Sequence, residues 1–276
     1  MKSTKILFTD LDGTLLDDQK NISRHSLDTI KRMTDAGHKL VLCSGRPINS
    51  VLAVSEQFGF TGPGFYVVSY NGGLIYDCYE KKTILHSPLS FDCVKYLFDQ
   101  AEQEGLHVHT YSDTHIISLH DTPELAHYCE HIKMPTLVTD DILGILDEEP
   151  MKLIVMDLNG RSRLEAFRAK LSSWAEGKVS STFSSPVLLE YGSPVSSKGN
   201  AVKHLCEYLN IPIENSVAAG DEENDTTMLE VAGVGAAMAN GIDIAKNAAD
   251  YITEHDNNHD GISEIIEKFI LELSPN

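Results

Sequence analysis

The chain has 276 residues, 42% of them hydrophobic, which is enough to bury the core of one large domain or of two ordinary ones. Its 22 basic residues against 41 acidic ones give a net charge of −19, which opposes binding to nucleic acid or to anionic membrane surfaces. The chain has no apolar run of transmembrane length, and an acidic residue comes early at its N-terminal end, so we expect a soluble, non-secreted protein. Scattered cysteines without a Cys-x-x-Cys pair favour the cytoplasm.

The first part of the chain alternates short β-rich runs with amphipathic stretches, the pattern of a parallel sheet covered by helices. Strands are predicted at 5–10, 38–45 and 65–73, and helices at 24–36 and 47–59. Ser23 is the expected N-cap of the first helix, and Gly37 follows its end. Two further runs, 74–77 and 81–86, predict an antiparallel hairpin.

Residues 85–189 differ from the first part, because their strands are more polar and irregularly spaced. Strands at 107–112, 115–120 and 152–159 and a helix at 161–177 predict an inserted α+β domain. Six of the chain's 12 histidines lie between His107 and His131. Their spacing could serve a transition metal, but no familiar zinc pattern is complete, so we expect a polar surface of the insert.

After the insert the alternation resumes within 187–210, where a helix is predicted with Lys198 in its first turn. Further helices are predicted at 226–233 and 261–273, and strands at 216–221 and 234–240. The predicted fold class is therefore α/β, with a doubly wound, mostly parallel, Rossmann-like sheet. This core is discontinuous, made of residues 1–84 and 190–276, and residues 85–189 form the inserted α+β domain.

Ligands of an open parallel sheet bind outside the carboxyl ends of its strands, so the residues that follow each core strand are the candidate site. Carboxylates gathered at one sheet edge repel one another unless a hard cation lies among them, and Mg²⁺ with carboxylate ligands usually binds phosphate oxygens. A lysine and a serine hydroxyl supply further partners for phosphate. These positions are Asp10, Asp12, Ser44, Gly45, Asn71, Asp221, Asn224 and Asp225 after strands, and Lys198 in the first turn of a helix.

Short motifs along both core segments, about 170 residues in all, resemble those of the haloacid dehalogenase superfamily in order and spacing. The match is to its Cof-type (class IIB) phosphatases, which carry a large α+β cap between the third core strand and the lysine motif. The motifs are "DLDGT" (10–14), "CSGRP" (43–47), "SYNGG" (69–73), "SSKGNA" (196–201), "GDEENDTTML" (220–229) and "AAMANG" (236–241).

This resemblance implies the catalytic roles of three residues. Asp10 would be the nucleophile that attacks a phosphate monoester and becomes an aspartyl-phosphate. Asp12 would protonate the leaving alcohol and then activate the hydrolytic water. Lys198 would pair with Asp10 and with the transferring phosphoryl group. The implied activity is Mg²⁺-dependent hydrolysis of small phosphate monoesters, sugar phosphates first among them.

The resemblance also implies which residues bind Mg²⁺ and phosphate. The carboxylates of Asp10 and Asp221 and the backbone carbonyl of Asp12 would ligate the metal, while Asp225 would orient its waters or Lys198. Ser44, Gly45 and Asn224 would contact the phosphoryl group or a bound water. Arg46 attracts phosphate or forms a surface ion pair, and the sequence favours neither.

Several alternatives stay open at this point. A phosphotransferase or phosphomutase would use the same intermediate, and nucleotides, flavin mononucleotide or pyridoxal phosphate are competing substrates. A phospho-accepting signalling domain combines similar residues, but the chain length, the large insert and Asp12 argue against it. A phosphate-binding protein without catalysis is a further alternative.

Overall fold

The computed structural model describes residues 3–112, 114–132 and 134–272, so residue 273, the last of the helix predicted at 261–273, lies outside the described part. The chain forms two compact units. One unit, the core, comprises the residues up to His86 and those from Ser197 onward, and the other, the cap, comprises Ser87–Ser196. Within the described residues, no helix combines the length and the apolar character needed to cross a bilayer.

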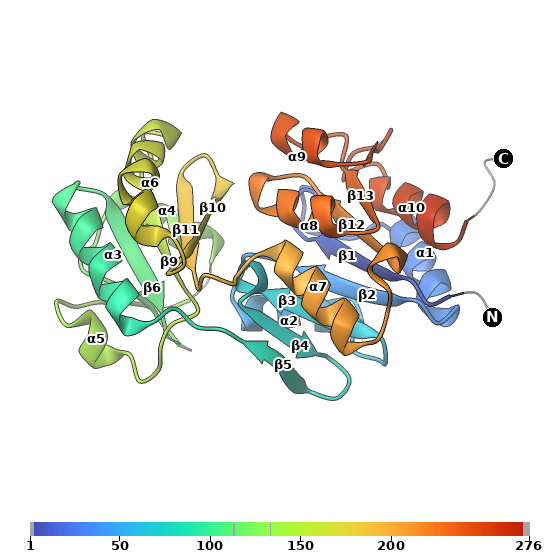
Figure 1. The fold of residues 1–276 in the computed structure, drawn as a ribbon, viewed down its shortest axis with the longest axis horizontal. Coiled ribbons are helices and arrows are strands. Elements are labelled where there is room, and N and C mark those ends of the chain that lie inside the picture. Colours follow the sequence, from blue (N-terminus) through green and yellow to red (C-terminus); the bar gives the residue numbers. More distant parts are fainter. Residues whose placement is uncertain (1–2, 113, 133, 273–276) are drawn as a thin grey trace. The chain divides into compact units, whose positions relative to one another are not determined.

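The core is built on an eight-stranded sheet (Figure 1). Its strands are β1 (Ile6–Asp10), β2 (Lys39–Cys43), β3 (Phe65–Ser69), β4 (Leu74–Asp77), β5 (Lys82–His86), β12 (Ser216–Gly220), β13 (Val234–Ala237) and β14 (Tyr251–Ile252). Their order is β14-β13-β12-β1-β2-β3-β4-β5, and neighbours are parallel from β14 to β3. The predicted hairpin is β4 and β5, which extend the sheet antiparallel at one edge.

Helices cover both faces of this sheet. Successive side chains of a strand point to opposite faces, so alternate residues of β1 pack against different helices. Leu7 packs in one apolar cluster with α1, α2, α10 and η4, whereas Ile6 and Phe8 pack in another with α7, α8 and α9. The predicted doubly wound, mostly parallel α/β fold is thus confirmed. The elements are α1 (Arg24–Asp35), α2 (Ile48–Gln57), α7 (Lys198–Tyr208), α8 (Thr226–Val231), α9 (Asp243–Ala248) and α10 (Gly261–Ile265), the π-helical turn η4 (Ile266–Ile270), and the 3₁₀ turns η1 (Tyr70–Gly72), η2 (Ile213–Asn215) and η3 (Glu223–Asp225).

The cap contains a six-stranded sheet in the order β10-β11-β9-β6-β7-β8. Its elements are α3 (Phe91–Gln103), β6 (His107–Tyr111), β7 (Ile116–Ser118), α4 (Pro123–His131), β8 (Thr136–Val138), α5 (Ile142–Ile145), β9 (Lys152–Met156), α6 (Arg161–Ala175), β10 (Ser180–Ser185) and β11 (Leu188–Gly192). Helices α3 and α6 pack on one face of the sheet, and α4 packs on the other, against Tyr111 and Ile154. The cap is therefore an inserted α+β unit.

The second segment of the core begins later than residue 190, where the sequence analysis places it. Residues 190–196 belong to the cap unit. The reason is that β11 pairs antiparallel with both β9 and β10, so Glu190 lies opposite Ile154 and Thr182. An apolar run such as "LLEYG" has the same appearance in either sheet, because its pairing partners are distant in sequence.

The predicted polar surface of cap histidines is wrong for His107 and His109, which are 8% and 0% exposed. His107 Nε2 lies 2.9 Å from His109 Nδ1, and Thr122 Oγ1 lies 2.8 Å from His107 Nδ1. Burial lowers the pKa of His107 to about 4. Both side chains are therefore neutral, hydrogen-bonded members of the cap interior at neutral pH.

Candidate active site

The loop that follows β1 lies against the loop that follows β12. Asp10 is the last residue of β1, and Asp221 comes directly after β12, the parallel neighbour of β1. The Thr14 hydroxyl donates a 2.6 Å hydrogen bond to Asp221 Oδ1. Gly13 has a φ of +81°, and a Cβ there would lie 2.3 Å from Asp221 Oδ2, so only glycine permits this approach. Strand order and the loop contact together bring the two aspartates to one sheet edge.

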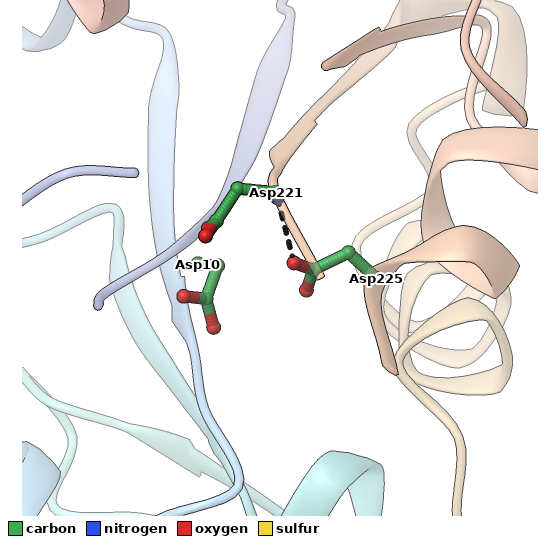
Figure 2. A group of neighbouring side chains, drawn as sticks. All are labelled: Asp10, Asp221 and Asp225. Carbon is green, nitrogen blue, oxygen red and sulfur yellow. Dashed lines mark hydrogen bonds between the residues drawn. The ribbon is translucent and has the colours of Figure 1, made fainter. Parts of the chain in front are cut away.

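Three carboxylates gather at this edge, those of Asp10, Asp221 and Asp225 (Figure 2). Each offers an oxygen, and these oxygens all lie within 4.8 Å of one another. Asp225, the last residue of η3, is held by the backbone N–H groups of Asp221 and Glu222, which donate to its Oδ2 at 2.9 and 3.0 Å. The backbone of the loop thus fixes the orientation of one carboxylate.

Lys198 is the cation of this cluster, and its side chain is 0% exposed. Its ammonium donates to Asp10 Oδ1 and, at 2.5 Å, to Asp225 Oδ1. Lys198 is the first residue of α7, and the preceding Ser197 caps that helix by accepting from the Asn200 N–H. The start of α7 therefore aims the lysine at two aspartates that are distant in sequence.

The electrostatics of the cluster show an excess of negative charge. Burial raises the pKa of Asp10 to about 7, although Lys198 opposes the shift. Burial, with the charges of Asp10 and Asp225, raises the pKa of Asp221 to about 8. Burial by itself would lower the pKa of Lys198, but Asp10 and Asp225 together hold it above its usual range. The lysine stays charged, but its single positive charge cannot balance three carboxylates.

Asp12 occupies a different environment from Asp10. Arg46 donates to both of its oxygens, from Nε to Oδ2 at 2.8 Å and from a terminal nitrogen to Oδ1 at 2.6 Å. Lys20 donates to Oδ1 at 2.7 Å. Burial raises the pKa of Asp12, but the two cations outweigh it and hold the pKa below its usual range. The ion pair of Arg46 is thus with Asp12 itself, a partner that the sequence analysis did not name.

The residues predicted to contact phosphate lie on neighbouring loops. Ser44, which is buried, follows β2, and its Oγ accepts from the Arg46 N–H at 3.1 Å. Its carbonyl accepts from the Asn71 N–H at 3.1 Å, while the Asn224 amide donates to Asn71 Oδ1 at 3.0 Å. Hydrogen bonds therefore link the Ser44 and Asn224 loops through Asn71, and Gly45 lies between Ser44 and Arg46 in the chain.

Some residues of this site did not come from the sequence reasoning. Thr14 lies within "DLDGT", so its hydrogen bond to Asp221 could have been sought from the motif. Asn240 donates to the Gly13 carbonyl at 2.7 Å, and it lies in the "AAMANG" motif. Lys20 carried no signal, because nothing local in the sequence links it to Asp12.

The donor set of the three aspartates fits a hard divalent cation. Mg²⁺ takes oxygen ligands. A bound cation also favours the ionised form of carboxylates whose pKa values are raised. Asp10 and Asp221 meet both conditions. Asp225 already uses one oxygen for Lys198 and the other for two backbone N–H groups, so orientation rather than direct ligation is its better role.

Comparison with known proteins places the chain in a family. Residues 7–266 match the family model of the haloacid dehalogenase-like hydrolases. A Bacillus subtilis 5-amino-6-(5-phospho-D-ribitylamino)uracil phosphatase is 30% identical over 271 residues, which cover 96% of this chain and 97% of that protein. A haloacid dehalogenase-like hydrolase from Bacteroides thetaiotaomicron superposes with a TM-score of 0.83 at 30% identity, covering 96% of this chain and 99% of that one. The chain belongs to the haloacid dehalogenase-like hydrolases, and it is a phosphatase.

Proposed function

We propose that this phosphatase hydrolyses small phosphate monoesters, above all sugar and sugar-alcohol phosphates, through an aspartyl-phosphate on Asp10, with Mg²⁺ as cofactor. The observation that carries the proposal is the buried cluster in which Asp10 contacts Lys198 and lies with Asp221 and Asp225. Its excess negative charge is suited to a divalent cation and a phosphate ester together.

Asp10 acts as the nucleophile. One carboxylate oxygen bonds to phosphorus while the bond from phosphorus to the ester oxygen breaks. Asp12, which takes up a proton from solvent in the substrate complex, gives that proton to the leaving alcohol. A water then attacks the aspartyl-phosphate, gives its proton to Asp12, and releases phosphate and the Asp10 carboxylate. Lys198 supports this step because its contact with Asp10 fixes the nucleophile and its charge offsets that of the phosphoryl oxygens.

The residues around Asp10 bind the phosphate and the metal. Ser44 and Gly45 donate hydrogen bonds to the phosphoryl oxygens, and Asn224 contacts the substrate or a water. Asp10 and Asp221, with the Asp12 carbonyl, hold Mg²⁺, and Asp225 orients Lys198. When bound, Mg²⁺ supplies positive charge that neutralises phosphate oxygens.

The substrate class rests on relatives and on chemistry. The Bacillus subtilis relative is named for a substrate whose phosphate is carried by a ribityl chain, a sugar alcohol. We therefore place sugar and sugar-alcohol phosphates first, and we assign their selection to the cap. All five cysteines are free, which favours a reducing compartment such as the cytoplasm.

The test is release of inorganic phosphate from a panel of hexose phosphates, ribitol 5-phosphate, flavin mononucleotide, pyridoxal phosphate and nucleoside monophosphates, with Mg²⁺ or with EDTA. We expect Mg²⁺-dependent turnover that is highest for a sugar or sugar-alcohol phosphate and is lost in Asp10→Asn. Asp35→Asn, at an exposed carboxylate of α1, is the matched control and should retain full activity. Turnover that survives in Asp10→Asn would contradict the aspartyl-phosphate route, and transfer to an added sugar would favour a phosphotransferase.

A further inference from the structure

We propose that Arg46 is a phosphate-binding residue that exchanges partners. It holds the Asp12 carboxylate while the site is without substrate, and it moves to the phosphate dianion when the substrate binds. This inference rests on the proposed function, in which Asp12 must reach the leaving-group oxygen. The exchange makes Asp12 available at the moment when it is needed.

Both oxygens of Asp12 already accept charge-assisted hydrogen bonds from cations. Arg46 Nε occupies Oδ2, while a second Arg46 nitrogen and Lys20 Nζ both occupy Oδ1. A general acid must come within hydrogen-bond reach of the ester oxygen that it protonates. Arg46 therefore competes with the leaving group for Oδ2, and opening of this bidentate pair gives that oxygen wholly to the leaving group.

The two cations contact the Asp12 carboxylate asymmetrically. Lys20 contacts Oδ1 alone, whereas Arg46 is the donor on Oδ2. If Arg46 leaves, Oδ2 becomes free for the leaving group, and Lys20 still contacts the other oxygen. The presence of Lys20 reduces the cost of the exchange, because Asp12 keeps one cationic partner throughout.

Arg46 follows Ser44 and Gly45, two residues predicted to contact phosphate, in the chain. Its backbone N–H donates to Ser44 Oγ at 3.1 Å, and its carbonyl accepts from the Tyr70 N–H at 3.2 Å. The backbone is thus anchored beside Ser44, and the side chain, 22% exposed, is the part that can turn. A guanidinium binds phosphate in the same bidentate manner as carboxylate, so the two anions are direct competitors.

The positive charges of Lys198 and Arg46 differ in how firmly their partners hold them. In the described part of the chain, Lys198 already contacts two aspartates and is fully buried, so its ammonium is committed to them. The partly exposed guanidinium of Arg46 is committed to one carboxylate that has a second cation. A dianion entering this acidic site can therefore draw on Arg46 while Asp12 keeps Lys20 as its partner.

The test is calorimetric titration of inorganic phosphate, in the presence of Mg²⁺, into the whole protein and its variants. Arg46→Gln should weaken phosphate binding by about tenfold or more, since it removes a charge-assisted, bidentate pair. Lys20→Gln removes an equal charge from the same carboxylate and is the matched control, with an expected loss of less than about threefold. Equal losses in the two variants would overturn the proposal, because general electrostatics would then explain both.

A double-mutant cycle gives the sharper readout. Asp12→Asn removes the competitor for the guanidinium, so it should tighten phosphate binding, and the gain should disappear in Arg46→Gln. A gain of the same size in both backgrounds would show that Asp12 acts only as a nearby negative charge, and it would contradict the exchange.

Two further measures keep the test decisive. Thermal unfolding reports whether each variant is folded, and Arg46→Lys, which keeps the charge but loses the fork, carries the test if Arg46→Gln does not fold. Binding of inorganic phosphate does not require turnover. A protein that hydrolyses none of the panel but passes the cycle would refute the proposed function alone, and the reverse result would refute the exchange alone.

Discussion

Each of the two units buries a lysine, and the two lysines differ in the charges that surround them. In the core, Lys198 is 0% exposed and contacts both Asp10 and Asp225, with Asp221 close by. In the cap, Lys152 is 3% exposed and donates to Glu190 at 2.9 Å. The two lysines are similarly buried, but the charged groups around them differ.

The cap pair is balanced in charge and satisfied by hydrogen bonds. Ser184 donates to the second oxygen of Glu190 at 2.6 Å, and Lys152 also lies over the Tyr111 ring, 5.5 Å from its centroid. The core cluster has more carboxylates than cations, and burial raises the pKa of Asp10 to about 7 and that of Asp221 to about 8. An acidic excess of this kind is relieved by bound protons or by a further cation, whereas a balanced pair needs neither.

The largest effect expected from this comparison is the loss of activity in Asp10→Asn. Removal of the proposed nucleophile should lower kcat by about a thousandfold or more. The free energy of unfolding should change by less than about 1 kcal/mol, because Lys198 keeps Asp225 and the repulsion from Asp221 is reduced. Steady-state kinetics and urea unfolding measure the two quantities. A large loss of stability would mean that the core cluster is structural, as in the cap.

The converse change is Lys152→Met in the cap. It leaves Glu190 buried without its cation, which should cost about 3–5 kcal/mol of stability, and adding Glu190→Leu should restore most of that loss. The chain has a single tryptophan, Trp174 in α6, which stacks on Tyr96 at 4.1 Å, so its fluorescence during urea unfolding reports on the cap. A single variant that loses less than about 1 kcal/mol would show that the pair is not structural.

The excess of carboxylates in the core cluster also predicts that stability depends on pH and on Mg²⁺. The folded protein retains protons on Asp10 and Asp221 up to about pH 7 and 8, whereas unfolded aspartates lose them near pH 4. Because the folded state binds more protons in this range, metal-free stability should fall as pH rises from about 4 to about 8. Mg²⁺ at a hundredfold excess over its Kd should restore about 2.7 kcal/mol at pH 8 and less at pH 5.5.

Differential scanning calorimetry with Mg²⁺ or EDTA at both pH values measures this dependence. Asp221→Asn is the informative variant, because it should flatten the fall in metal-free stability and reduce the Mg²⁺ effect. The same metal response in Asp221→Asn and in the parent protein would remove Asp221 from the proposed ligand set.

The sequence predicted the core better than the cap, and the physical reason lies in the range of the interactions. Parallel strands buried on both faces read as continuous apolar runs, as in β1 and β2, so they were recognised directly. The short elements α5 and α9 were not predicted, and the second core segment was placed from residue 190, before β11 ends. These elements depend on tertiary contacts more than on local pattern.

Within the candidate active site too, local features could be predicted from the sequence, whereas contacts between distant segments could not. Asp10 and Asp12 were found because a strand that ends in two carboxylates is visible locally, and the converging strand ends then indicated Asp221. The contact of Lys198 with Asp10 spans 188 residues, and the family resemblance was needed to expect it. The bidentate ion pair between Arg46 and Asp12 depends on side-chain orientations in two loops, which no sequence pattern specifies.

The smallest expected effect comes from a comparison of two helix N-caps, one in the core and one in the cap. Ser197 accepts from the Asn200 N–H at 3.0 Å in the core, and Ser90 accepts from the Cys93 N–H at 3.4 Å in the cap. Alanine at either position should cost about 1 kcal/mol of stability. Only Ser197→Ala should also lower kcat, by about threefold, because Lys198 is the next residue and its position depends on that cap. Equal kcat values in the two variants would mean that Asp10 and Asp225, rather than the start of α7, position the lysine.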